Sequence, residues 1–204
     1  ESMEIDDRRC DWVQKLCYGM GHVYNDLCAA MWFSYTLFYL QIVLQMDSKT
    51  AGTLIMTGQI VDSLATPVVG WAVDRTGARR AWHLAGTLAA SVGFSLIYCL
   101  KPTSLNTQIV INYGLVISLF QIGWAVTQIS HLSIIPEIAT SHAHTSDLTA
   151  IRYMASRLFT TLTLIYIPLY LDERRAGSEV SVHRRKCVHT FMKTSCRMYV
   201  VLYH

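Results

Sequence analysis

The sequence predicts an all-α membrane protein with about five membrane-spanning helices, and three observations predict it. Of the 204 residues, 52% are hydrophobic and only 15% are charged, whereas soluble domains carry about 25% charged residues. The mean hydropathy is +0.30. The apolar residues also gather in stretches long enough for helices that cross a bilayer core about 30 Å thick. A lone strand in lipid would leave its backbone groups unpaired, so each stretch is expected to be helical.

Polar segments divide the apolar residues into five predicted spans. The spans are expected at 16–45, 51–73, 82–100, 109–130 and 148–171. The first link is the short segment 47–49, the third begins at 101–104, and the fourth is the polar, histidine-bearing segment 136–147. The second link is the basic loop 74–81.

Basic residues near the span ends predict the orientation of the chain. They cluster before the first span and after the second, at Arg8, Arg9, Lys15, Arg75, Arg79 and Arg80. The alternate links hold only Lys49 and Lys101. Because cytosolic loops carry an excess of Lys and Arg, the N-terminus and the 74–81 loop are predicted to be cytosolic.

The end of the chain does not fit this alternation. By the same rule the tail after the fifth span faces the opposite side, yet it is basic, with Arg174, Arg175, Arg184, Arg185 and Lys186. Its last stretch, 187–203, is too polar to span. We therefore expect a transporter-like helix bundle over 1–171 and, over 172–204, a polar basic tail that is not its native continuation. The first residue is Glu1 rather than Met, so an initiating segment is expected to be missing.

The composition also argues against several classes of function. No basic face of the kind that tracks phosphates is present, so no nucleic acid is expected as a partner. The six cysteines show no C-x-x-C pair, and no cofactor or metal is expected. An intramembrane metalloenzyme built on His22, His131, His142 and His144 would lack the H-E-x-x-H spacing, so we do not expect an enzyme.

Four ionisable residues inside the predicted spans are the leading functional candidates. They are His22, Asp26, Asp62 and Arg152, and a charge at such a position costs about 2.5–3.5 kcal/mol on insertion scales. Polar residues share a helical face in three spans: His22 with Asp26; Gln59 with Asp62 and Thr66; and Gln121 with Gln128 and His131. These faces predict a shared interior cavity, across which Arg152 could neutralise Asp26 or Asp62. Alternatively, His22 and His131 serve as hydrogen-bonding residues between helices.

The basic loop carries a recognisable pattern. Its residues follow G-x-x-x-D-R-x-G-x-R-R, formed by Gly70, Asp74, Arg75, Gly77, Arg79 and Arg80. This pattern resembles the loop between the second and third helices of major facilitator superfamily transporters. The resemblance implies a secondary transporter with a gating loop at 70–80. Such transporters have twelve helices in two halves, so the chain would be a partial N-terminal half that binds a solute and a coupling cation within a lipid bilayer.

Two helix signatures resemble the glycoside-pentoside-hexuronide:cation symporter branch of this superfamily. They are Tyr18-Gly19-x-Gly21 with Asn25-Asp26, and Asp62-x-x-x-Thr66-Pro67-x-x-Gly70. The resemblance implies a substrate site with Asp26 and Arg152, joined by Gln128 and His22, and a cation-coupling site with Asp62 and Thr66. Thr66 and Gln128 stand where the branch has acids. A sodium ion would want those charges, whereas a proton needs one carboxylate, so proton coupling is expected.

Further segments resemble a eukaryotic group within the superfamily. They are residues 22–32, 81–84, 128–133 and 148–153. This resemblance implies transport of cysteine rather than a sugar, in a lysosomal or related organelle membrane, with the plasma membrane as the alternative. The expected function is thus proton-coupled symport of a small polar solute such as cysteine or a sugar. The second hypothesis is a truncated, non-transporting membrane protein that regulates or assembles with a full-length transporter.

Overall fold

The computed structural model describes residues 12–100, 102, 106–139 and 142–175. Within them the chain forms helices and no strand, so the predicted all-α class is confirmed. The elements are α1 (Trp12–Phe38), the π-helical turn η1 (Tyr39–Val43), α2 (Ser48–Thr76), α3 (Arg79–Cys99), α4 (Thr107–Leu132), α5 (Ile135–Ile138) and α6 (His142–Arg175). Most of the predicted tail, 176–204, lies outside the described residues.

Three helical segments of the described chain are long and apolar enough to cross a membrane. They are Tyr18–Val43, Arg79–Cys99 and Thr107–Ile138. α2 and α6, with 29 and 34 residues, also have the length, but they carry charged residues along their course. That α2 and α6 span the membrane therefore stays a prediction.

The helix ends follow from side chains that satisfy free backbone groups. The carboxylate of Asp47 caps α2 by accepting hydrogen bonds from the N–H groups of Lys49 and Thr50. Asn106 caps α4 in the same way, through the N–H of Ile109. At the other end of α2, Gly77 has a φ of 63° and donates its N–H to Val73 O, a left-handed cap that favours glycine.

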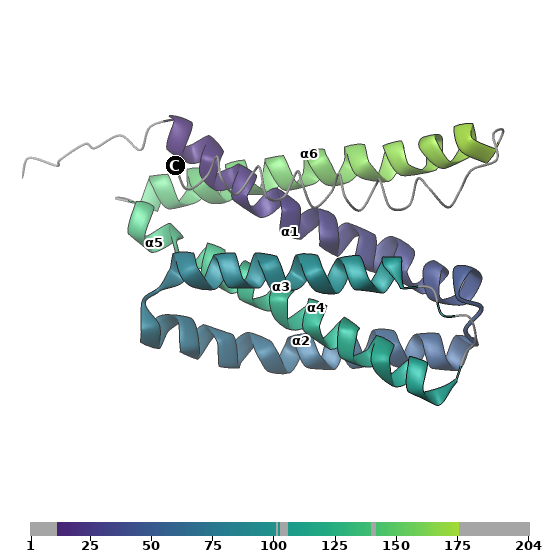
Figure 1. Ribbon diagram of the computed structural model, residues 1–204. Helices are drawn as coiled ribbons and strands as arrows, with labels where there is room; N and C mark the ends of the chain where they lie inside the picture. The colour runs from purple at the N-terminus through teal and green to yellow at the C-terminus, as the bar shows by residue number, and fades with distance from the viewer. Residues whose placement is uncertain (1–11, 101, 103–105, 140–141, 176–204) are drawn as a thin grey trace, which may run out of the picture.

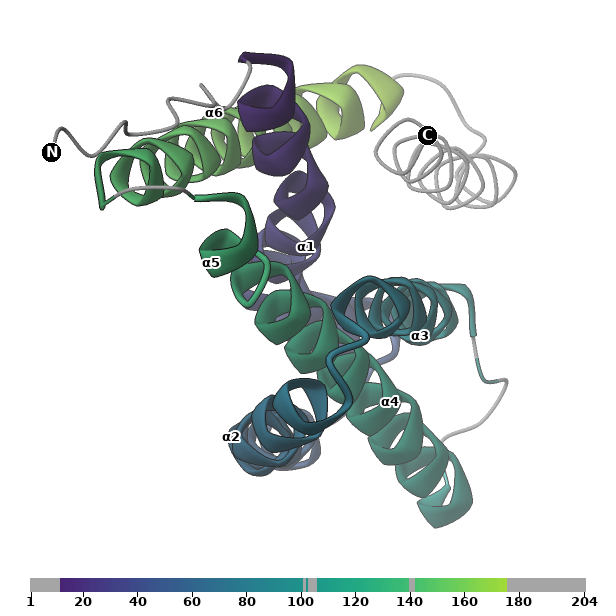
Figure 2. The same cartoon turned by 90° about the vertical axis from the view of Figure 1, so that its left-hand side faces the viewer.

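The helices form two packed groups (Figures 1 and 2). α4 packs against both α2 and α3, whereas α6 packs against α1. The α3–α4 contact is close because glycines face the neighbouring backbone: a Cβ atom at Gly93 would lie 2.8 Å from the Cα of Phe120, and one at Gly86 would lie 2.7 Å from the N of Thr127. Small residues of this kind let membrane helices approach each other.

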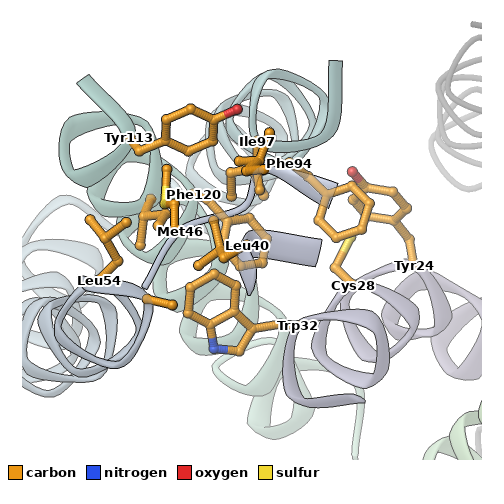
Figure 3. Close-up of a cluster of buried hydrophobic side chains, with 14 residues drawn as sticks. Tyr24, Cys28, Trp32, Leu40, Met46, Leu54, Phe94, Ile97, Tyr113 and Phe120 are labelled. Atoms are coloured by element: carbon orange, nitrogen blue, oxygen red, sulfur yellow. The ribbon is translucent and has the colours of Figure 1, made fainter. Parts of the chain in front are cut away.

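The larger apolar cluster includes Leu40, Leu44 and Met46 from η1 and the turn that leads to α2, and Figure 3 shows it in close-up. Trp32 and Phe94 each pack on the fully buried ring of Phe120, at centroid distances of 5.5 and 5.6 Å. Helices α1, α2, α3 and α4 all contribute to this cluster, whose other members include Tyr24, Cys28, Leu40, Met46, Leu54, Ile97 and Tyr113. A second, smaller apolar cluster joins α2, α3 and α4 near the basic loop, and it consists of Val69, Val73 and Val126 with Trp82 and Ile129 packed against them.

Candidate functional site

The histidines and ion pairs described below lie near the end of the bundle that carries the basic loop. The start of α1, the loop between α2 and α3, α5 and the start of α6 all lie at this end (Figure 1). His22 and His83 are each four residues from the first residue of their candidate spans, Tyr18 and Arg79. At a rise of 1.5 Å per residue, they lie about 6 Å inside this end.

Three histidines from three helices are in contact there. The ring of His131 in α4 stacks on those of Tyr18 and His22 in α1, at centroid distances of 4.3 and 4.9 Å. The ring of His83 in α3 lies 5.5 Å from that of His131. All three imidazoles are buried, with 3 to 4% of each residue exposed. We call His22, His83 and His131 the histidine cluster.

His22 connects α1 to α6 through its Nε2 atom. This atom lies 3.5 Å from Nη1 of Arg152 and 3.4 Å from Oδ1 of Asp26. His22 therefore joins Asp26 and Arg152, and all three are predicted residues of the substrate site. Among the described residues, Arg152 forms no direct ion pair with Asp26 or Asp62, so its charge meets that of Asp26 across the imidazole.

Asp62 lies apart from this group. It is the central residue of α2, and within the described chain its carboxylate makes no hydrogen bond or ion pair. Thr66 is exposed, and its hydroxyl donates to the main-chain oxygen of Asp62 at 2.9 Å. Because α2 packs mainly on α4 while α1 packs on α6, the two acids Asp26 and Asp62 belong to different contacts.

The polar stripe of α4 meets different neighbours along its length. Gln121 is fully buried beside Gly58 of α2, where an added Cβ would lie 3.0 Å from Nε2 of Gln121. His131 meets α1 and α3 in the histidine cluster. Gln128, between them, is half-buried. The polar stripe of α4 thus takes part in two separate helix contacts within the described bundle, one with α2 and one with α1 and α3.

The basic loop is largely exposed at the same end of the bundle. Asp74, Arg75 and Arg80 are exposed, and the guanidinium of Arg75 lies 5.2 Å from the ring of Trp71. Nothing lies within 4 Å of a Cβ atom added at Gly70.

Two ion pairs join neighbouring helices beside the cluster. Arg79 at the start of α3 pairs with Glu137 of α5, and Nζ of Lys15 in α1 donates to Oδ2 of Asp147 in α6 at 2.8 Å. The hydrogen bond from Lys15, together with its charge, lowers the pKa of Asp147. These pairs tie α3 to α5 and α1 to α6 at the basic end.

Sequence reasoning missed His83, Glu137 and Asp147. The signal for His83 was its depth: in antiparallel helices, residues close to the basic ends of their spans meet in one layer. Glu137 and Asp147 lie in the 136–147 link, which the alternation of spans places on the same side as the basic residues of the N-terminus and the 74–81 loop. Their charge could have identified them as ion-pair partners of those basic residues. Within the described residues, no three His, Cys, Asp or Glu side chains are arranged to hold a metal ion.

Comparisons with known proteins agree with these features. Residues 17–203 match the family described as MFS/sugar transport protein. The chain is 45% identical over 152 residues to "Major facilitator superfamily domain-containing protein 12" of Homo sapiens, covering 69% of this chain and 32% of the relative. The mouse protein of the same name gives 45% identity over 148 residues, covering 68% and 31%.

A more distant relative carries a functional name. It is the "Uncharacterized symporter sll1374" of Synechocystis sp., with 25% identity over 173 residues, covering 80% of this chain and 32% of the relative. The chain spans about a third of the length of the curated relatives it matches. The family match includes most of the segment after residue 171, for which a non-native continuation stays a prediction.

These matches confirm the superfamily predicted from the basic loop and the closeness to the domain-containing protein 12 group. They also agree with a partial transporter fold, because the helical chain corresponds to about a third of its relatives. The chain belongs to the major facilitator superfamily, in the family of MFS/sugar transport proteins.

Proposed function

We propose that the chain forms the first part of a proton-coupled symporter for a small polar solute. Membership of a transporter family and a relative named as a symporter support transport with a coupling cation. The observation that carries the proposal is the linkage between α1 and α6, in which the buried His22 connects the half-buried Asp26 and Arg152. Charged groups inside an apolar bundle are costly and belong to substrate or ion pathways in most membrane proteins.

An amino acid such as cysteine fits this linkage better than a sugar does. Arg152 and Asp26 lie at most about 7 Å apart, the sum of their distances to His22. A zwitterion offers a carboxylate for the guanidinium and an ammonium group for the acid, whereas a neutral sugar needs neither charge. The resemblance of residues 22–32, 81–84, 128–133 and 148–153 to a eukaryotic group of the superfamily implies the same choice. We propose a lysosomal or related organelle membrane as its location.

The other candidate residues have proposed roles of their own. Gln128 contributes a polar group to the substrate site, and the 70–80 loop gates the cytosolic side. The symporter-branch resemblance implies Asp62 with Thr66 as the coupling site, which is the alternative to coupling through His22. In the described chain their contacts are separate from those of His22. Coupling through Asp62 and coupling through His22 are therefore distinguishable by mutation.

A second candidate function is a non-transporting membrane protein that regulates or assembles with a full-length transporter. Transporters of this class build their sites between two halves, so such a protein would act by packing against one of those halves.

Uptake into proteoliposomes tests both functions. Two proteins are reconstituted separately: the 204-residue chain and a longer transporter that begins with residues 1–171. Uptake of labelled cysteine or hexose is then measured under an imposed proton or sodium gradient. We expect cysteine uptake by the longer protein that follows the proton gradient. Uptake that follows sodium and ignores pH would contradict the proton as coupling ion. If only the longer protein transports solute, and its flux rises when the 204-residue chain is added, the regulatory function is favoured.

Arg152→Gln provides the test of the substrate site. This substitution removes the guanidinium that we propose binds the carboxylate of the solute, and with it a charge-assisted hydrogen bond, so the KM for cysteine should rise at least about tenfold. Lys49→Gln is the control, since Lys49 is an exposed cation in the first turn of α2 and belongs to no proposed site. Equal effects of the two substitutions would remove Arg152 from the substrate site.

A further inference from the structure

One nitrogen of His22 faces two groups that it cannot satisfy together. Arg152 only donates hydrogen bonds, whereas an ionised Asp26 only accepts them. Nε2 of His22 can accept from Arg152 at 3.5 Å only when it carries a lone pair, and it can donate to Asp26 at 3.4 Å only when it carries a hydrogen. A proton on Nε2 therefore decides whether His22 pairs with Arg152 of α6 or with Asp26 of its own helix, α1.

The surroundings of His22 provide a place for one proton. The charged and titratable groups around it come from each element packed against it: Tyr18 and Asp26 of α1, His83 of α3, His131 of α4 and Arg152 of α6. Nδ1 of His22 and Nε2 of His131 are buried and make no hydrogen bond to described residues. Two imidazolium rings 4.9 Å apart would repel each other strongly in a low dielectric, so the stacked pair accommodates one added proton rather than two.

We infer that His22, supported by His131 and His83, is the proton-binding group of the transporter, and that proton binding transfers its contact from Arg152 to Asp26. The inference deepens the proposed function and rests on it for its consequence in transport. The cationic His22 pairs with the negative Asp26 and repels the guanidinium. Arg152 is then released to bind an anionic group.

This exchange of partners links the proton to a particular class of solute. Before proton binding, the charges of Arg152 and Asp26 balance across a neutral His22. Afterwards His22 balances Asp26, and the positive charge of Arg152 needs a partner. A solute with a carboxylate, such as an amino acid, supplies it, and the buried charges balance again. Proton and carboxylate binding therefore favour each other, which is what symport requires.

Nitrogen NMR tests the exchange of partners without any transport measurement. The full chain is reconstituted in lipid nanodiscs with ¹⁵N-labelled histidine and arginine, and the pH is lowered from about 8 to 5, the interval in which histidine usually titrates. We expect Nε2 of His22 to gain a proton while the guanidinium signals of Arg152 change over the same pH interval. If the protonation of His22 and the signals of Arg152 both stay constant, the inference is wrong, whatever the coupling ion.

Transport of the longer protein supplies the second measurement. His22→Gln keeps a hydrogen-bonding side chain that cannot take the proton. Cysteine uptake by this variant should therefore be the same at about pH 8 and at about pH 5. His142→Gln is the matched control, because His142 is exposed at the start of α6, and its uptake should keep the pH dependence. Uptake by His22→Gln that still follows the proton gradient would overturn the inference. If neither labelled solute is transported while the NMR exchange is observed, the proposed function fails and the proton-dependent contact stands. If His22→Gln does not fold, the NMR titration of the unchanged protein decides.

Discussion

Asp26 and Asp62 illustrate how differently two half-buried acids can be accommodated in one bundle. Asp26 lies within 3.4 Å of His22, which in turn contacts the guanidinium of Arg152. Asp62 lies in the middle of α2 and has no hydrogen-bonding or charged partner among the described side chains. A protonation event at Asp26 or His22 changes the contact between two helices, whereas one at Asp62 changes only its own side chain.

This difference predicts the outcome of Asp62→Asn. If the coupling proton binds at His22, Asp62→Asn should keep proton-driven accumulation of solute. His22→Gln should abolish this accumulation and spare downhill exchange. Accumulation against a gradient in proteoliposomes measures both variants. The reverse pattern, with accumulation lost only in Asp62→Asn, would return coupling to Asp62, the residue that the symporter-branch resemblance implies.

The Lys15–Asp147 pair predicts a pH dependence of stability. The hydrogen bond and charge of Lys15 hold the pKa of Asp147 below its usual value, so the pair stabilises the folded state above the unfolded pKa near 4. That contribution is lost as the pH falls through the lower, folded pKa. Because Asp147 is exposed, Asp147→Asn should lower the melting temperature at pH 7 by at most about 4 °C.

Thermal unfolding in detergent at pH 7 and pH 3 measures this effect. The difference between the variant and the original chain should shrink at the lower pH, because pH 3 lies below the unfolded pKa near 4 and part of the stabilisation by the ionised Asp147 is then lost. Asp74→Asn is the control, since Asp74 is exposed at the same end and forms no ion pair with described residues. A loss of stability that is the same at both pH values would contradict the role of the ion pair.

At the scale of helices, the close approach of α3 and α4 sets the position of two of the three histidines. His83 and His131 extend from these helices, and Gly86, Gly93 and Gly123 bring the two backbones together. A side chain at one of these glycines would separate the helices and thereby move the rings apart.

Gly93→Ala tests this contact. The added Cβ would lie 2.8 Å from both Cα and N of Phe120, which is backbone and cannot turn away. Overpacking of this kind costs about 1–3 kcal/mol, so the melting temperature should fall clearly. Gly52→Ala is the control, because it lies in α2 with nothing within 4 Å of an added Cβ and should be neutral or slightly stabilising. An unchanged melting temperature for Gly93→Ala would mean that the helices are not so closely packed.

At the scale of the whole molecule, the sequence was sufficient for properties that depend on composition and local spacing. Hydropathy and length predict the all-helical class, and the spacing of four predicts that His22 and Asp26 share a face. Contacts between distant segments were not predictable in the same way. The contact of His83 with His131 depends on how α3 packs on α4, and the pairing of Arg79 with Glu137 depends on the position of α5.

Orientation in the membrane is also a property of the whole molecule, and α2 provides the best test. Its 29 residues make a helix about 43 Å long, more than a bilayer core of about 30 Å. Ser48 and Ala78 are exposed beside opposite ends of this helix. If α2 spans the membrane with the basic loop in the cytosol, cysteines at these positions should react from opposite sides.

The measurement uses Ser48→Cys and Ala78→Cys in a background without the six native cysteines. A membrane-impermeant maleimide is added to sealed vesicles of known orientation, before and after permeabilisation. Position 78 should be labelled only from the cytosolic side, because Arg75, Arg79 and Arg80 keep this loop there, and position 48 only from the other side. Labelling of both from one side would mean that α2 does not cross the bilayer. Exchange of the two sides would reverse the orientation, and the histidine cluster would then lie near the luminal or extracellular surface.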